Sequence, residues 1–150
     1  MKEIEQGRYN FTIYEANYGQ ISKFKSLAEK EQVQIKKDKG KTRYLGAYNY
    51  HHLIGFAGWA IIGEKIRYKA DFVYKKWRGM GVYTKLWEAR EKEVLKIIKD
   101  KEIKSITAYC TKRSLPMFLK NGFNVVSKQK NGITFVEKKI KKHEIVQEMD

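Results

Sequence analysis

Residues 71–86 join a strand-like run to a helix through a turn that contains two glycines. Gly79 and Gly81 let the backbone bend tightly and approach a ligand with no side chain in between. The first amides of the following helix have no acceptor within it, and the helix dipole places its positive end there. With Arg78 beside them, and Lys75 or Lys76 nearby, they predict a phosphate-binding turn. The alternative is an ordinary connection between a strand and a helix.

This turn differs from the two common nucleotide motifs. The dinucleotide fingerprint has three glycines directly after a buried strand and an acidic residue about 20 positions later. The P-loop has Gly-Lys-Ser/Thr at a fixed spacing. The sequence has neither pattern, so neither kind of nucleotide site is expected.

The same segment resembles the central signature of the GNAT superfamily of N-acetyltransferases, Arg/Gln-x-x-Gly-x-Gly/Ala. Arg78 and Gly81 match it, and Tyr83 stands where a small residue is usual. The stretch before it, typically Val-x-Pro-x-Tyr-Arg-Gly, begins here at Val73 and has Lys75 in place of the proline.

A second GNAT signature ends in Tyr-x-x-x-Gly-Phe, and residues 118–123 match it except at the first position. The order of predicted elements also looks like that fold over nearly the whole chain. The resemblance implies direct transfer of an acetyl group from acetyl-coenzyme A to an amine, without a covalent enzyme intermediate. The protein then has to position the reactants, remove the amine proton and protonate the departing thiolate.

The resemblance further implies where acetyl-coenzyme A binds. Backbone amides of the turn from Arg78 to Tyr83 would hold its pyrophosphate. The strand over residues 71–73 would diverge from the strand over residues 103–109, and the pantetheine arm would lie in that opening. The expected cofactor-binding residues are Phe72, Val73, Arg78, Gly79, Met80, Gly81, Val82 and Tyr83.

The tyrosine that usually protonates the thiolate is replaced by Phe118, which has no proton to give. Tyr109, at the end of a strand, is the first candidate to replace it. Ser114, at the mouth of a helix, and Tyr83 are the others. The competing interpretations are a tyrosine that packs at the sheet edge and a serine that caps a helix.

Asp71 is the candidate general base, because it is the only carboxylate between Glu64 and Glu88. Burial would raise its pKa toward the useful range. The alternatives are that it faces solvent or pairs with a lysine. Cys110 is disfavoured as a nucleophile, because no histidine lies near it in the sequence and a lone cysteine is more often a small buried hydrophobe.

Aromatic residues and cations alternate around one predicted strand. Tyr44, Tyr48, Tyr50 and His51–His52 lie beside the lysine-rich residues 36–43. Base stacking and phosphate contacts require this combination, so the region is a candidate nucleic-acid surface. The alternative is an exposed tyrosine-rich strand with a solvated loop. Residues 137–142 form a second basic cluster with the same ambiguity, and Trp59, Trp77 and Trp87 are expected in packing.

Hydrophobic periodicity predicts the elements that carry these residues. Strands are expected over residues 9–16, 44–50, 52–62, 66–74, 103–109, 123–128 and 133–140, and helices over 20–35, 82–99 and 115–120. Asn131-Gly132 predicts a hairpin turn, and Asn121-Gly122 a helix end. The order β-α-β-β-β-α-β-α-β-β predicts an α+β fold, a mixed and mostly antiparallel sheet flanked by helices.

Composition sets further bounds. The 150 residues predict one domain over residues 1–140 and a polar tail over 141–150. Lysine and arginine number 32 against 17 acids, a net charge of +15 that favours an anionic partner such as nucleic acid. No run is long enough to cross a membrane, no signal segment is evident, and a cytoplasmic protein is expected. The sequence has one cysteine and three histidines, too few of the usual ligands for a structural zinc site, so no metal site is expected.

The sequence therefore predicts an acetyl-coenzyme A-dependent N-acyltransferase with an unidentified amine acceptor. The positive charge disfavours basic peptides and polyamines as acceptors and leaves aminoacyl-tRNA, a nucleobase, an acidic protein or a small amine. The alternative is a GNAT-fold protein that binds nucleic acid or modifies its bases, with weak or no acetyltransferase activity. Dimers are common in the family, so a homodimer is among the expected partners.

Overall fold

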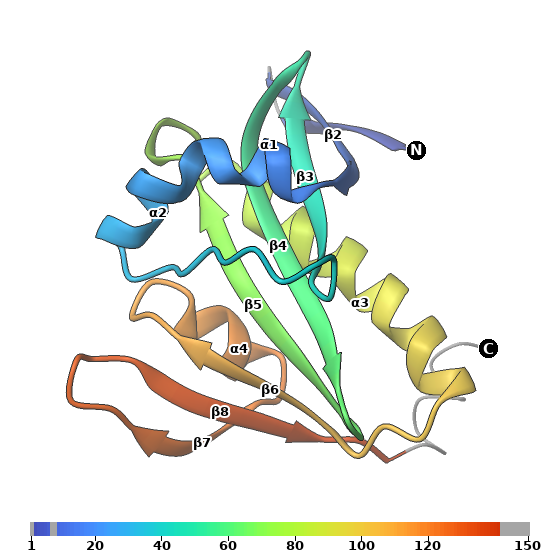
Figure 1. The fold of residues 1–150 in the computed structure, drawn as a ribbon. Coiled ribbons are helices and arrows are strands. Elements are labelled where there is room, and N and C mark those ends of the chain that lie inside the picture. The colour runs from blue at the N-terminus through green and yellow to red at the C-terminus, as the bar shows by residue number, and fades with distance from the viewer. Residues whose placement is uncertain (1, 7–8, 142–150) are drawn as a thin grey trace. The chain divides into compact units, whose positions relative to one another are not determined.

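The structure, a computed structural model, describes residues 2–6 and 9–141 (Figure 1). The chain divides into two compact units. The first comprises Met1–Trp59 and Ala70–Lys92, and the second Ala60–Lys69 and Glu93–Asp150. The single domain expected over residues 1–140 stays a prediction. Of the expected tail, residues 142–150 lie outside the described residues.

Strands of the first unit pair antiparallel in chain order. They are β1 (Lys2–Gln6), β2 (Tyr9–Ala16), β3 (Arg43–Asn49) and β4 (His52–Ile62). Asn49 pairs with His52, so Tyr50 and His51 alone turn the chain between β3 and β4. The strand β1 was not predicted, because four of its five residues are charged or polar and the sequence shows no apolar face.

Two short helices follow β2; in Figure 1 the first crosses in front of β4, and the second lies farther to the left. They are α1 (Tyr18–Ile21) and α2 (Lys25–Lys30), joined by the 3₁₀ turn η1 (Ser22–Phe24). Asn17 begins α1 with a capping box, in which its side chain accepts from the Gln20 amide at 2.9 Å.

The helix predicted over residues 20–35 is wrong beyond Lys30. Gln32 adopts a φ of 65°, a left-handed conformation that a continuing helix cannot contain. Val33 and Ile35 are buried while Gln34 between them is exposed. This alternation is that of an extended segment, whereas the prediction continued the helix to residue 35.

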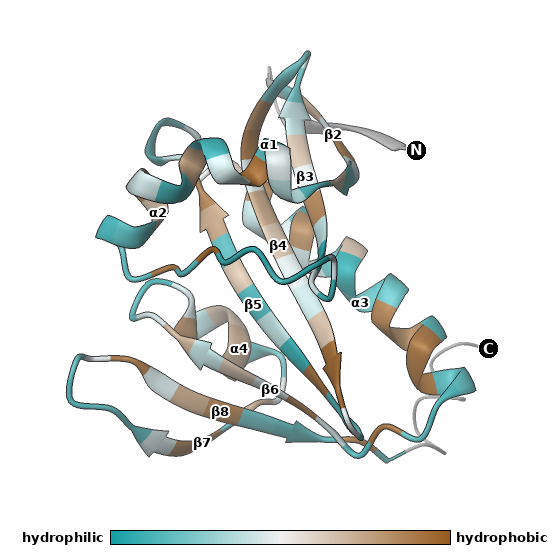
Figure 2. Ribbon diagram, viewed as in Figure 1, coloured by the Kyte–Doolittle hydropathy of each residue, from teal (hydrophilic) through white to brown (hydrophobic). Residues whose placement is uncertain are grey.

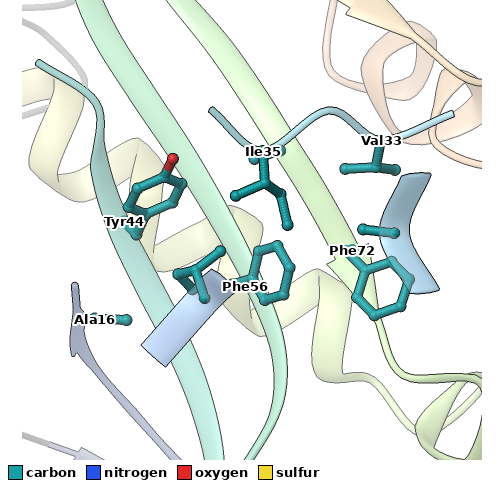
Figure 3. Packing of buried hydrophobic residues seen from close by; sticks show 9 residues of the cluster. Ala16, Val33, Ile35, Tyr44, Phe56 and Phe72 are labelled. Carbon is teal, nitrogen blue, oxygen red and sulfur yellow. The ribbon is translucent and has the colours of Figure 1, made fainter. Parts of the chain in front are cut away.

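The core of the first unit lies between these helices, the extended segment and the strands. Figure 3 shows side chains from all of them pointing toward one another. The rings of Phe56 and Phe72 are 5.4 Å apart, and Phe24 lies 6.1 Å from each. The buried members are Ala16, Ile21, Ala28, Val33, Ile35, Tyr44, Phe56, Ala70 and Phe72.

Strand β5 (Lys65–Val73) belongs to the second unit up to Lys69 and to the first unit from Ala70. In the second unit it pairs parallel with β6 (Ser105–Cys110), from Lys65–Ser105 to Tyr68–Ala108. Strand β8 (Thr134–Lys139) pairs antiparallel with β6 on one side and with β7 (Asn124–Lys128) on the other. Gly132 has a φ of 84° in the β7–β8 turn, as the predicted Asn-Gly hairpin requires.

Two further helices, α3 and α4, complete the set of α-helices in the described residues. Helix α3 (Val82–Asp100) shows alternating polar and apolar bands in Figure 2. Helix α4 (Leu115–Lys120) has Pro116 in its first turn and is followed by Gly122 at a φ of 88°, as predicted. In Figure 1 it lies behind β6. Its Phe118 packs against the ring of Tyr68 at 6.3 Å, so this face of the strands is covered.

The predicted α+β class and the mixed, mostly antiparallel sheet flanked by helices are confirmed. The strand β1 precedes the predicted order. No helix in residues 2–6 and 9–141 combines the length and apolar character needed to span a membrane.

Candidate active site

The glycine-containing turn has the geometry that the sequence predicts. After β5, the 3₁₀ turn η2 (Lys75–Trp77) leads to Gly79 and Gly81, with φ of 78° and 83°. A Cβ at Gly79 would meet no atom within 4 Å, so the turn has open space in front of it. The first helical hydrogen bond runs from Lys85 N to Gly81 O at 3.1 Å. The preceding amides of α3 therefore have no acceptor within the helix.

Gly55 on β4 sets how closely this turn approaches the strands. A Cβ at Gly55 would lie 3.1 Å from the carbonyl oxygen of Phe72 and 3.3 Å from methyl groups of Val73 and Val82. These contacts join β4, the end of β5 and the start of α3 within the first unit. A larger residue at position 55 would push the turn away from the strand.

The side chain of Arg78 makes hydrogen bonds to other residues of the first unit. Its Nε donates to the carbonyl of Val73 at 2.9 Å, and its Nη2 donates to the carboxylate of Glu31. The guanidinium also lies 5.8 Å from the ring centre of Phe72. Its own amide donates to Lys75 O at 3.3 Å. Arg78 therefore holds the shape of the turn and ties it to the end of α2.

A groove of about 580 Å³ lies beside this ion pair in the first unit. Its walls are mainly apolar, although one glutamate and two lysines are among the residues that line it. The residues that line it are Leu27, Glu31, Phe72, Tyr74, Lys75 and Lys76.

Asp71, the predicted base, lies in a buried charge network. Its oxygens accept from Arg90 Nη1 at 2.6 Å and Nη2 at 2.9 Å, and the Tyr83 hydroxyl donates to Oδ2. The Asp71 side chain is 7% exposed and that of Arg90 is fully buried. Arg90 also donates to the carbonyl of Gly58 at 3.1 Å. The carboxylate is thus the charge partner of an arginine, where the sequence had suggested a lysine or solvent as the alternatives.

Tyr83 explains one departure from the family signature. It lies one helical turn before Trp87 on α3, with ring centres 6.2 Å apart, and reaches Asp71 on β5. Arg90 lies 4.9 Å from the Trp87 ring, on the same side of the helix. The large side chain at position 83 is therefore accommodated on the face of α3 that packs on the strands.

The other two predicted catalytic residues, Tyr109 and Ser114, belong to the second unit. Tyr109 is 55% exposed near the end of β6 and stacks on Phe135, 4.6 Å away between ring centres. Ser114 is buried, its amide donates to Thr111 Oγ1 at 3.2 Å, and its hydroxyl lies 3.2 Å from that oxygen. Its side chain makes no capping bond to α4. Cys110 is a buried thiol.

The predicted aromatic surface around β3 is only partly exposed. Tyr44 is 4% exposed and belongs to the core of the first unit, so its assignment to a surface is wrong. Burial raises the pKa of Tyr44, and the Asp38 carboxylate raises it further. A side-chain hydrogen bond with Thr42 acts in the opposite direction and lowers this pKa. Burial likewise raises the pKa of Tyr48. Tyr50 alone of the three is widely exposed, at 86%.

Sequence reasoning missed Glu31 and Arg90. Glu31 follows a helix whose end was misplaced, so its approach to the turn was hidden. Arg90 was one charge among many on a helix whose polar side was assumed to face solvent. A signal existed, because Tyr83, Trp87 and Arg90 recur at helical spacing on one face.

Comparisons with known proteins identify the family. A family profile described as "Acetyltransferase (GNAT) domain" matches residues 6–142, whereas no curated protein sequence matches the chain. Among solved structures, a GNAT-family acetyltransferase from Staphylococcus aureus is 18% identical, with a TM-score of 0.64, and 87% of this chain covers 99% of it. The PaiA N-acetyltransferase of Thermoplasma acidophilum, in complex with coenzyme A, is also 18% identical, with a TM-score of 0.63 and coverage of 87% and 99%.

A third similar structure is the N-acetylglutamate synthase of Neisseria gonorrhoeae, complexed with coenzyme A and N-acetyl-glutamate. It is 13% identical, with a TM-score of 0.67, and 87% of this chain covers 35% of that longer one. At these identities the structures support the fold, and the profile match spans most of the sequence. The chain therefore belongs to the GNAT acetyltransferase domain family, as its signatures suggested.

Proposed function

We propose that the protein is an N-acyltransferase that moves an acetyl group directly from acetyl-coenzyme A to an amine. Acetyl-coenzyme A is the acyl donor of this family. The observation that carries the proposal is the turn at the start of α3, where two left-handed glycines expose backbone amides at the positive end of a 19-residue helix.

The residues present fit this donor. The open space in front of Gly79 admits a phosphate group, because no side chain occupies it. The amides from Gly79 to Tyr83, with Met80 and Val82 between them, would hold the pyrophosphate. Phe72 and Val73 would contact the pantetheine arm, and the divergence of their strand from β6 stays a prediction. When bound, the donor supplies an activated thioester, and the protein supplies position.

We assign Asp71 to positioning rather than to proton removal. Both of its oxygens already accept hydrogen bonds from Arg90, and Tyr83 donates to one of them. Because the Tyr83 hydroxyl donates its proton to Asp71 in this hydrogen bond, we do not assign Tyr83 as the proton donor to the thiolate. Tyr109 remains the proposed proton donor to the thiolate, since it is the exposed hydroxyl among the candidates. Ser114 is buried within its own turn, which argues against this role.

Thermal unfolding tests the proposal, with acetyl-coenzyme A as ligand and adenosine 3′,5′-bisphosphate and ATP as controls for charge attraction. A ligand at 100 times its Kd adds about 2.7 kcal/mol, which moves the midpoint by roughly 5–10 °C at this size. The proposal expects that shift with acetyl-coenzyme A and a much smaller one with the controls. Equal small shifts with all three would favour the alternative, a GNAT-fold nucleic-acid-binding protein with weak or no transferase activity.

A further inference from the structure

One face of the second unit carries aromatic and cationic side chains around the buried Ser105 and Thr107. Cross-strand partners share a face of a sheet, so Arg67, Thr107 and Glu137 lie on one face in one row, and Tyr109 and Phe135 in the next. The opposite face differs, because there Tyr68 packs against Phe118 and Phe123. Lys65 and Lys139 extend the first face on either side of Ser105.

Tyr109, Phe135 and Arg67 form a preorganised group. The two rings lie 4.6 Å apart at an interplanar angle of 36°. The guanidinium of Arg67 lies 5.0 Å from the Tyr109 ring and 5.9 Å from the Phe135 ring, and Thr107 Oγ1 accepts from its Nε at 3.0 Å. Tyr109 nevertheless remains 55% exposed. The result is a partly exposed pair of tilted rings beside a cation that Thr107 holds.

The charge of the chain is concentrated in the same unit. Its described residues, 60–69 and 93–141, hold fifteen lysines and arginines against five acids, whereas those of the first unit hold fifteen against nine. Lys65 and Lys139 on the face are exposed, and Glu137 is its one acid among the paired rows. Rings on an open sheet face stack on unpaired bases, and cations beside them contact the phosphates.

We propose that this face, defined by Arg67, Tyr109 and Phe135 with Lys65 and Lys139, binds single-stranded nucleic acid. The further step, that the bound strand carries the acceptor amine, rests on the proposed acyltransferase function. Stacking provides contact with any unpaired base, and the cations provide affinity that depends on salt. A polyanion without bases, such as heparin, can contact the cations but has no base to stack on the rings.

The test is fluorescence anisotropy with labelled oligo-U and oligo-dT of 12 nucleotides, in the absence of acetyl-coenzyme A and over a range of salt. We expect Tyr109→Ala to weaken binding roughly 5- to 100-fold, and Tyr109→Phe to keep it within about 2-fold. Arg67→Ala should weaken binding and reduce the salt slope by about one. Heparin binding should respond to Arg67→Ala and not to Tyr109→Ala.

Matched variants control for exposure and charge. Tyr50→Ala removes an exposed tyrosine from the first unit, and Lys99→Ala removes an exposed cation from α3; neither should change binding by more than about 2-fold. Two results would overturn the proposal: Tyr109→Ala binding like the wild type, or Tyr50→Ala being the variant that loses affinity. Circular dichroism confirms that each variant is folded.

The two proposals fail separately. If the protein shifts normally with acetyl-coenzyme A but binds no oligonucleotide, the nucleic-acid proposal is contradicted and the transferase proposal stands. If the protein binds the oligonucleotides but shows no shift with acetyl-coenzyme A, the transferase proposal is contradicted and the nucleic-acid proposal stands. A preference for oligo-U over oligo-dT would indicate contacts with the ribose 2′-hydroxyl.

Discussion

Arg90 is a charged side chain with no exposed surface, held by Asp71, the Gly58 carbonyl and the ring of Trp87. Removing one member of a buried ion pair leaves the other charge unpaired and costs about 3–5 kcal/mol. We therefore expect Arg90→Met to lower the free energy of unfolding by that amount in urea titrations. Asp71→Leu combined with Arg90→Met should recover at least half of it.

The control is Lys92→Met, which removes an exposed cation from the same helix and should change stability by no more than about 0.5 kcal/mol. A double variant as unstable as the sum of the two single ones would show that the side chains act independently. Asp71 would then be available for the base role predicted from the sequence.

Tyr109 and Ser114 are separated by one kinetic comparison once an acceptor is known. Tyr109→Phe keeps the ring and removes the proton, so we expect kcat to fall by about 100-fold with little change in KM. Ser114→Ala should leave kcat nearly unchanged, because its hydroxyl is bonded within its own turn. The reverse pattern would transfer the acid role to Ser114.

At the scale of elements, the β3–β4 hairpin contains a residue in an unfavourable conformation. Tyr50 has a φ of 54° and is 86% exposed, so strain there is not offset by burial. Glycine adopts such a φ without steric cost, and we expect Tyr50→Gly to raise the free energy of unfolding by about 0.5–1 kcal/mol. Tyr14→Gly, within β2 and also exposed, should instead destabilise the protein. A destabilised Tyr50→Gly would mean that the ring makes contacts that matter.

The elements also show what the sequence could predict. The strands from β3 to β5, the long helix α3 and the turn around Gly79 follow from strong periodicity and glycine chemistry. Gln32 ends a helix without a glycine or proline, so no local signal marked the change to an extended segment. The ion pairs of Arg90 with Asp71 and of Arg78 with Glu31 depend on tertiary packing. Because the sequence contains many other lysines and arginines, nothing in it marked these two arginines as the ones that pair.

At the scale of the whole molecule, two tyrosines make stability depend on alkaline pH. Burial raises the pKa of Tyr44 and of Tyr48 above the value of 10 that they have when unfolded. Their protons are therefore lost first from the unfolded chain, and stability falls as the pH rises above 10 toward the folded pKa values. The slope is at most about 1.4 kcal/mol per pH unit for each tyrosine.

Urea unfolding between pH 9 and 11 measures this dependence. The double variant Tyr44→Phe, Tyr48→Phe should lose less stability over that range than the wild type. The lysines titrate in both proteins and so cancel in the comparison. Equal losses in the two proteins would show that these phenols do not control alkaline stability.

The central claim is that backbone geometry at the start of α3 binds acetyl-coenzyme A, and two glycines offer a matched test. Gly79 and Gly63 both have positive φ, 78° and 61°, and a Cβ at either would meet no atom within 4 Å. Alanine at each position therefore introduces similar backbone strain, but only position 79 lies in the turn. The measurement is a calorimetric titration of acetyl-coenzyme A into the wild type, Gly79→Ala and Gly63→Ala. We predict at least a tenfold loss of affinity for Gly79→Ala and wild-type affinity for Gly63→Ala; equal affinities for all three, or no binding by the wild type, would contradict the account.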